Sequence, residues 1–143
     1  MAKPDPALLD PARYPHHLET LPRFGDLDPF QHVNNVAMAR LFEDARARFN
    51  RASGFTAQPP REGMLVASMT IDYLGEATYP QALQICSAAT QIGRTSLIMI
   101  QLALQNDAPV ALSRTVMVQI RDGKSAPLTE HRLAQLQDWM LRP

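Results

Sequence analysis

Residues 24–35, FGDLDPFQHVNN, gather more hydrogen-bonding side chains than a loop needs in order to turn. Asp26 and Asp28 lie two positions apart, His32 follows a proline-containing turn, and two adjacent asparagines close the stretch. A carboxylate can act as a general base or as a nucleophile. Asparagine is a favoured N-cap of a helix. The stretch is therefore a candidate reaction site that lies directly before a helix.

The start of that helix supplies the second half of the chemistry. A helix that begins at Asn34 or Asn35 has backbone N–H groups without partners inside the helix. These groups and the positive end of the helix dipole can stabilise negative charge on a carbonyl oxygen. Asp28 precedes Asn35 by seven residues, and acyl transfer requires both a carboxylate of this kind and such donors. The pattern predicts acyl transfer.

Each residue of the stretch also has a purely structural interpretation. The two aspartates can cap turns, His32 can be a hydrogen-bonded structural histidine, and the asparagines can serve as caps alone. Paired acids also suggest a metal, but magnesium or zinc needs further ligands and only His32 is near, so we expect no metal. We find no serine or cysteine nucleophile motif, phosphate-binding glycine loop or zinc-ligand spacing elsewhere in the sequence.

A long helix is the element that must position this site. From residue 35 to about residue 52 the apolar side chains recur at three- and four-residue steps, which predicts a helix with one buried stripe. Gly54 supplies its stop. We expect Asp44 to pair with Arg40 and Arg48 on the outer face. The predicted stripe consists of Met38, Leu41, Phe42, Ala45 and Phe49.

Strand patterns account for most of the remaining chain. Pro22 favours a sheet edge for the first strand, and Gly93, Asn106-Asp107 and Asp122-Gly123 mark turns between later ones. We expect the last four strands to form an antiparallel meander, so that one helix packs on a curved five-stranded sheet in an α+β fold. The predicted strands are 16–24, 64–74, 81–92, 95–105 and 108–121.

The whole chain fits one domain, 1–143, with a proline-rich extended arm over 1–15 and a short helix within 128–141. Lysine plus arginine and aspartate plus glutamate both number 14, which argues against nucleic acid or an anionic membrane as partner. The single Cys86 cannot form an internal disulfide. With neither an apolar run for a membrane helix nor a signal peptide, we expect a cytoplasmic protein. Uncovered sheet edges predict a homo-oligomer.

Beyond these patterns, the segment RFGDLDPFQHVNNVAMARLFEDAR resembles the signature of hotdog-fold acyl-CoA thioesterases of the 4-hydroxybenzoyl-CoA thioesterase family. The likeness continues through MTIDYLGEATYPQALQICSAATQIGRTSLIMIQLAL, which is similar to the family's strand, bend, next strand and IGRTS turn. VALSRTVMVQIRDGKSAPL is similar to its closing strand and exit. The resemblance covers most of the chain.

This resemblance implies a hotdog fold and hydrolysis of an acyl-CoA thioester, with no cofactor beyond coenzyme A in the substrate. It implies that Asp28 is the catalytic carboxylate and that the polarising amide lies around Asn35. It implies that His32 and Asn34 support the loop or the pocket, while Asp26 is structural. The substrate would thread between subunits of a homodimer or homotetramer. Candidates to hold its phosphates are Arg94, Arg121 and Lys124.

Some alternatives stay open at this point. Many relatives have a glycine where this chain has Phe30-Gln31, so the loop is expected to differ in shape. A second thioesterase arrangement carries its acid on the helix, where Glu43 and Asp44 are more simply solvated charges.

Other functions and the acyl group itself also remain open. A hotdog hydratase would need the spacing GD-x-N-P-x-H, one residue shorter than that from Asp26 to His32. A non-catalytic acyl-CoA sensor is a further alternative. The side chains that would select the acyl group are Phe30, Met38, Met64 and Met69.

Overall fold

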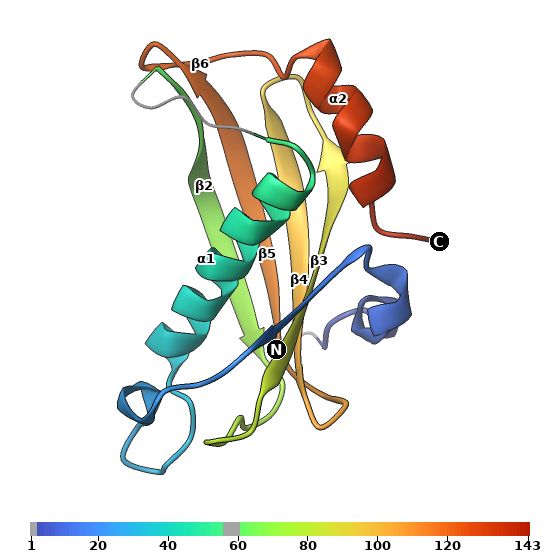
Figure 1. The fold of residues 1–143 in the computed structure, drawn as a ribbon. Coiled ribbons are helices and arrows are strands. Elements are labelled where there is room, and N and C mark those ends of the chain that lie inside the picture. Colours follow the sequence, from blue (N-terminus) through green and yellow to red (C-terminus); the bar gives the residue numbers. More distant parts are fainter. Residues whose placement is uncertain (1–2, 56–60) are drawn as a thin grey trace.

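The computed structural model describes residues 3–55 and 61–143. A single long helix, α1 (Asn35–Ala52), lies against one face of a curved antiparallel sheet (Figure 1). The expected α+β architecture, a five-stranded sheet around a central helix, is confirmed. Neither α-helix in the described ranges is long and apolar enough to cross a membrane. The strands lie in the order β1 (His16–Thr20), β3 (Leu83–Ile92), β4 (Ser96–Gln105), β5 (Ala108–Arg121) and β2 (Glu62–Tyr73), and β6 (Lys124–Ser125) also pairs with β5.

The expected meander of four strands is wrong in one respect. Strands β3, β4 and β5 follow one another as neighbours, but β2 pairs with β5 at the far edge and does not touch β3 in the sheet. Residues 74–82 form a long connection across the end of the sheet, whereas a tight turn joins only adjacent strands. Asn106 and Asp107 form such a turn, with φ 52° and 63°.

Helix α1 begins and ends at the residues that the sequence indicates. The side chain of Asn34 caps it by accepting a hydrogen bond from the N–H of Ala37 at 2.7 Å. At its other end Gly54 adopts φ 93°, the left-handed conformation that glycine takes most easily. The predicted apolar stripe is confirmed, because all its members are buried.

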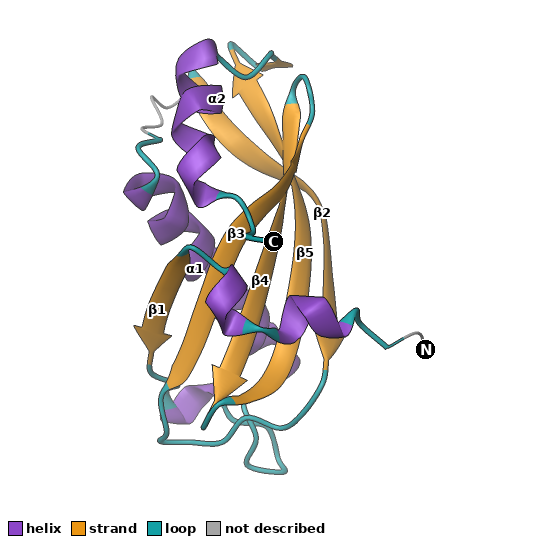
Figure 2. Cartoon of the chain, turned by 90° about the vertical axis from the view of Figure 1, so that its right-hand side faces the viewer, coloured by secondary structure: helices purple, strands orange, loops and turns teal. Residues whose placement is uncertain are grey.

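The opposite face of the sheet is covered by the N-terminal arm (Figure 2). Tyr14 is 1% exposed and packs with Leu8 and Leu9 against the outward side chains of β3, β4 and β5. The arm is not fully extended, since it forms two 3₁₀ turns, η1 (Pro6–Leu9) and η2 (Pro11–Arg13). Aspartates that accept hydrogen bonds from N–H groups two residues later cap both turns.

The C-terminal segment packs near the C-terminal end of α1 and also contacts the N-terminal arm. Helix α2 (Glu130–Leu136) and the 3₁₀ turn η4 (Gln137–Trp139) bring Trp139 to 5.7 Å from the ring of Phe49. Beyond them the chain returns to the arm, where the N–H of Arg142 donates to the carbonyl of Arg13 at 2.8 Å. The guanidinium of Arg13 donates back to the carbonyl of Arg142 at 2.7 Å.

Substitution of Tyr14 tests whether the arm is part of the folded core. Tyr14→Ala is expected to lower the free energy of unfolding by about 3–4 kcal/mol, since it removes a fully buried aromatic ring. Tyr14→Phe should cost about 1 kcal/mol, because it loses only the hydrogen bond from the hydroxyl to the carbonyl of Leu8, 2.7 Å long. Urea unfolding measures both. Equal, small losses would mean that the arm contributes little.

Candidate active site

The polar stretch forms a short hairpin that leads directly into α1. Leu27 and Val33 form an antiparallel bridge. The N–H of Asp28 donates to the carbonyl of His32 at 2.9 Å, and the N–H of Asn34 donates to the carbonyl of Asp26 at 2.8 Å. The backbone therefore fixes the pairing of the two sides of the hairpin and brings Asp28 opposite His32.

The two carboxylate oxygens of Asp28 have different surroundings. Oδ1 accepts hydrogen bonds from the N–H groups of Phe30, at 2.8 Å, and His32, at 3.1 Å. Oδ2 accepts no hydrogen bond from any residue in the described ranges, and the side chain is half-buried. One oxygen thus holds the loop together, while the other is available to a ligand.

The loop has the shape that a glycine would give it, although it contains none. Gln31 adopts φ 65° at the turn where the resemblance leads us to expect a glycine. This left-handed conformation costs an ordinary residue roughly 1–2 kcal/mol. Gln31 therefore adopts this conformation without a glycine, and the hydrogen bonds to Asp28 keep the turn closed.

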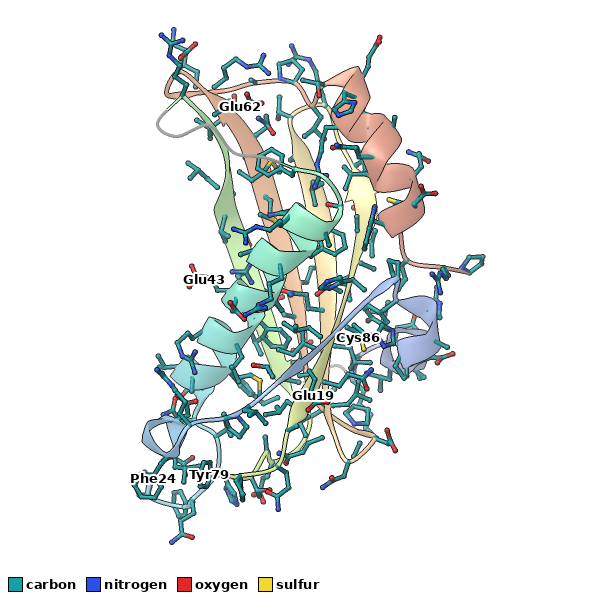
Figure 3. All side chains as sticks on the ribbon, in the orientation of Figure 1. Glu19, Phe24, Glu43, Glu62, Tyr79 and Cys86 are labelled. Carbon is teal, nitrogen blue, oxygen red and sulfur yellow. The ribbon has the colours of Figure 1, made fainter. Side chains whose placement is uncertain are left out.

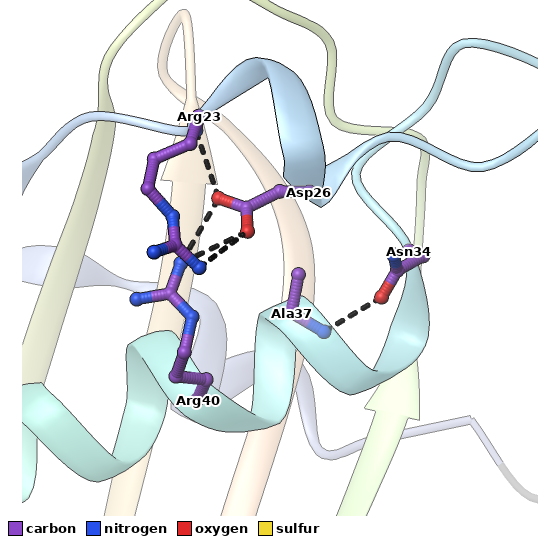
Figure 4. Close-up of polar contacts among 5 residues, drawn as sticks. All are labelled: Arg23, Asp26, Asn34, Ala37 and Arg40. Atoms are coloured by element: carbon purple, nitrogen blue, oxygen red, sulfur yellow. Dashed lines mark hydrogen bonds and ion pairs between the residues drawn. The ribbon is translucent and has the colours of Figure 1, made fainter.

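Asp26 fastens the hairpin to α1 (Figure 4). Its side chain is 3% exposed and accepts from Nη2 of Arg40 on α1, at 2.9 and 3.1 Å. The backbone N–H of Arg23 donates to it at 2.8 Å and Nη2 of Arg23 at 3.2 Å. Burial alone would raise the pKa of Asp26, but these donors outweigh it, so the pKa lies below its ordinary value.

This contact corrects one expectation from the sequence. Arg40 was expected to pair with Asp44, one turn along the helix, but it reaches back to Asp26 in the hairpin. Asp44 does pair with Arg48, at 3.0 Å, as expected. Asp26 and Arg40 are fourteen positions apart, so helical spacing does not predict this pair. The pair forms because the hairpin folds back onto α1.

A second loop, residues 76–79, supports the hairpin from the other side. The N–H of Val33 donates to the carbonyl of Ala77 at 2.8 Å, and Nε2 of His32 lies 3.2 Å from the carboxylate of Glu76. The rings of Phe24 and Tyr79 meet edge to face, with centroids 6.0 Å apart (Figure 3).

Gln105 holds this second loop in place. It is 6% exposed, and its amide exchanges hydrogen bonds of 2.8 Å with the backbone N–H and carbonyl of Thr78. No pattern in the sequence marks Gln105, because a glutamine at the end of a strand gives no signal of this role.

The first turn of α1 leaves two amides open. Asn34 satisfies the N–H of Ala37, but the N–H groups of Asn35 and Val36 donate to no acceptor within the described ranges. Val36 is 72% exposed, so the first turn of α1 lies at the surface of the chain. The hydroxyl of Tyr73 donates to the carbonyl of Asn35 at 3.0 Å and connects β2 to this turn. The hairpin and the open amides thus adjoin each other.

Other residues singled out in the sequence lie elsewhere. Arg94, in the β3–β4 turn, is at the end of the sheet away from the hairpin, as are Arg121 and Lys124 (Figure 1). Within one chain Arg94 is therefore not brought to Asp28. Glu43 and Asp44 stay on the exposed face of α1. Among the described residues no three acidic, histidine or cysteine side chains converge as they would around a metal ion.

Comparisons with known proteins relate the chain and its fold to thioesterases. The family model described as the thioesterase-like superfamily matches residues 22–142. A thioesterase from Thermus thermophilus, solved in complex with coenzyme A and Zn, is 29% identical, with a TM-score of 0.80 over 92% of this chain and 98% of that one. A thioesterase-superfamily structure from Jannaschia sp. CCS1 is 27% identical, with a TM-score of 0.81 over 96% of this chain and 92% of that one. The Bacillus subtilis (strain 168) protein YsmA is 28% identical over 111 residues, 76% of each chain.

Asp26→Asn tests the attachment of the hairpin to α1. The variant should lose about 2 kcal/mol of unfolding free energy near neutral pH, because a neutral amide binds the two arginines less strongly. The folded pKa of Asp26 is lowered from 3.8, so its stabilisation is complete above that value and is lost as pH falls through the folded pKa. The difference between the two proteins should therefore shrink in acid.

Urea unfolding over a series of pH values measures this difference. Asp44→Asn is the matched control, because it breaks an exposed ion pair on the same helix and should cost less than about 1 kcal/mol. A loss at Asp26 that is independent of pH would show that charge is not what holds the hairpin.

Proposed function

The chain belongs to the thioesterase-like superfamily, and we propose that it is an acyl-CoA thioesterase that hydrolyses its substrate to a free acid and coenzyme A. What carries the proposal is the half-free carboxylate of Asp28 in a hairpin that adjoins two open amides at the start of α1. The Thermus thermophilus relative, solved with coenzyme A, supports this ligand. We further propose the arrangement of the 4-hydroxybenzoyl-CoA thioesterases, with the acid in the hairpin rather than on the helix.

In this mechanism the thioester carbonyl oxygen accepts a hydrogen bond from the N–H of Asn35. That donor and the positive end of α1 stabilise the negative charge that develops on the oxygen. Oδ2 of Asp28 attacks the carbonyl carbon or removes a proton from an attacking water. The carbon–sulfur bond then breaks, and the sulfur leaves as the thiol of coenzyme A after it takes up a proton that comes from water, through Asp28 in the general-base route. In the nucleophilic route a water molecule then hydrolyses the anhydride between Asp28 and the acyl group, which releases the free acid and restores the carboxylate.

The remaining hairpin residues act on geometry. His32 donates its backbone N–H to Oδ1 of Asp28, and Asn34 caps the helix so that the amides before Ala37 stay open. The contact between Asp26 and Arg40 holds both parts at a constant separation. Positioning of this kind lowers the barrier because reacting groups no longer have to find one another.

The distribution of cations supports a homo-oligomer, a dimer or a tetramer. Coenzyme A carries phosphates, and Arg94 in the β3–β4 turn and Arg121 and Lys124 in the β5–β6 hairpin lie at the end of the sheet away from the start of α1. A second copy in the opposite orientation would bring its cations toward this hairpin. Strand β2 offers an unpaired edge for such a copy, with Leu65 and Val66 58% and 48% exposed.

Asp28→Asn tests the carboxylate without dismantling the loop. The amide oxygen of asparagine can still accept from the N–H groups of Phe30 and His32, so the hairpin should survive. Loss of the charge should lower kcat for thiol release by about 10²–10⁴-fold. A thiol-reactive dye and a panel of acyl-CoA thioesters measure it, with Asp44→Asn as the control. Equal turnover by variant and wild type would remove Asp28 from the mechanism.

Asn35→Pro tests the amide separately. Proline lacks the N–H but is favoured at the first position of a helix. Asn34, the preceding residue, already has φ −73° and ψ 163°, which proline requires of it. The variant should fold normally and lose about 10²–10³-fold in kcat.

Asn35→Ala is the matched control for this amide, since it retains the N–H and should retain most of the activity. If proline and alanine behave alike, the amide of Asn35 is not the donor. If the wild type binds acyl-CoA but releases no thiol, the proposal that the protein hydrolyses thioesters is wrong. Loss of the crotonyl-CoA double bond without thiol release would instead identify a hydratase.

A further inference from the structure

A band of polar side chains crosses the face of the sheet that α1 covers. On β3, β4 and β5 the inward positions change from apolar to polar and back to apolar along each strand. The polar residues are fully buried and lie side by side, since Gln101 pairs with Ser87 on one side and with Ser113 on the other. We call Ser87, Gln101, Ser113 and Thr115 the polar band.

Arg46 extends from α1 over this band and is 6% exposed. Its Nη1 lies 3.4 Å from Oε1 of Gln101 and 3.8 Å from the sulfur of Met69 on β2. It therefore spans from β4 to β2, across the positions of Ser113 and Thr115 on the intervening β5. Gln101 in turn donates to the carbonyl of Phe42 and to Oγ of Ser87, at 3.2 and 3.0 Å.

The charge of Arg46 has no counter-ion among the described residues. Residues 3–55 and 61–143 include every aspartate and glutamate of the sequence, and none of these carboxylates forms an ion pair with Arg46. Burial lowers the pKa of Arg46, and Glu43 opposes this effect only from the exposed face. A buried cation without an anion is costly, typically by several kcal/mol. Stability alone does not explain why the core contains it.

The polar band lies next to the edge strand β2, whose inward side chains are more exposed than those of β3, β4 and β5. Inward side chains of β3, β4 and β5 around the band are buried, whereas Met69 and Ile71 on the edge strand β2 remain half-exposed. Met69 touches Arg46 directly. A ligand that runs along α1 beside β2 would therefore meet the guanidinium, with the hydroxyls and amide of the polar band behind it.

We propose that Arg46 and the polar band recognise a carboxylate at the far end of the acyl group, so that the preferred substrate is the thioester of a dicarboxylic acid. This inference rests on the proposed thioesterase function and deepens it. The carboxylate would complete the ion pair that the chain lacks, and a planar guanidinium binds a carboxylate through two parallel hydrogen bonds.

The helix sets the length of such an acyl group. Arg46 follows Asn35 by eleven residues, about 16.5 Å along the axis at about 1.5 Å per residue. Side chains on a helix lean toward its N-terminus, so the arginine side chain itself covers part of this span, and an acyl chain of ten carbons is long enough for the rest. Decanedioic acid bound to coenzyme A through one carboxyl is thus a suitable probe, and decanoyl-CoA is its partner without the second carboxylate.

The test compares kcat/KM for these two thioesters in the wild type and in Arg46→Met. We expect the wild type to favour the decanedioyl thioester at least tenfold, and the variant to lose that preference while it still hydrolyses decanoyl-CoA. Replacement of a buried charge by an apolar side chain of similar length is often tolerated in folding. Arg48→Met, on the exposed part of the same helix, should leave the ratio unchanged.

A wild type that hydrolyses decanoyl-CoA equally well or better would overturn the inference, as would an unchanged ratio in Arg46→Met. Failure of the proposed function itself looks different, because neither thioester would release thiol. In that case calorimetry measures the binding of free decanedioate and of free decanoate instead. Tighter binding of decanedioate that Arg46→Met abolishes would support the site, and no preference between the two acids would overturn it.

Discussion

The ion pair between Asp26 and Arg40 is the constraint on which the candidate site depends. The hairpin and α1 are adjacent in sequence, but adjacency fixes no angle between them. Two hydrogen bonds from Arg40 to a carboxylate that is 3% exposed supply that angle. The carboxylate is shielded from water, while the side chain of Arg40 is 40% exposed, so water screens this pair less than a fully exposed one. The position of Asp28 relative to the open amides of α1 depends on this angle.

The sheet serves different purposes on its two faces. The outer face carries one apolar cluster beneath the arm, and this cluster is an ordinary core. The inner face holds two apolar clusters separated by the polar band and by a buried arginine. An ordinary core gains nothing from such a division, since polar groups of this kind are merely satisfied by one another. The proposed binding of a carboxylate by Arg46 and the polar band would account for this division.

Local signals in the sequence predicted much of this structure. Periodicity and caps fixed α1 within Asn35–Ala52, and the turn residues at Asn106-Asp107 separated β4 from β5. The predictions that failed concern contacts between residues far apart in the sequence. The pairing of β2 with β5 depends on the path of residues 74–82 across the sheet, which the periodicity of the side chains does not predict. The partner of Arg40 depends on how the hairpin folds back.

The same limit applies to the site. The hairpin was recognisable because its chemistry lies within twelve consecutive residues. Arg46 formed part of the resemblance, but its burial over Gln101 joins positions 55 residues apart and became visible only in three dimensions. Gln105, which anchors the second loop, was equally hidden.

The mutual hydrogen bonds of Arg13 and Arg142 join the N-terminal arm to the C-terminal segment. Segments near the ends of a domain commonly fray, and fraying is the usual first step of local opening. Here each segment is a tether for the other, so the arm cannot peel from the sheet unless the C-terminal segment is released as well. Amide hydrogens in both segments should therefore exchange with solvent together, as one cooperative unit rather than as two independent tails.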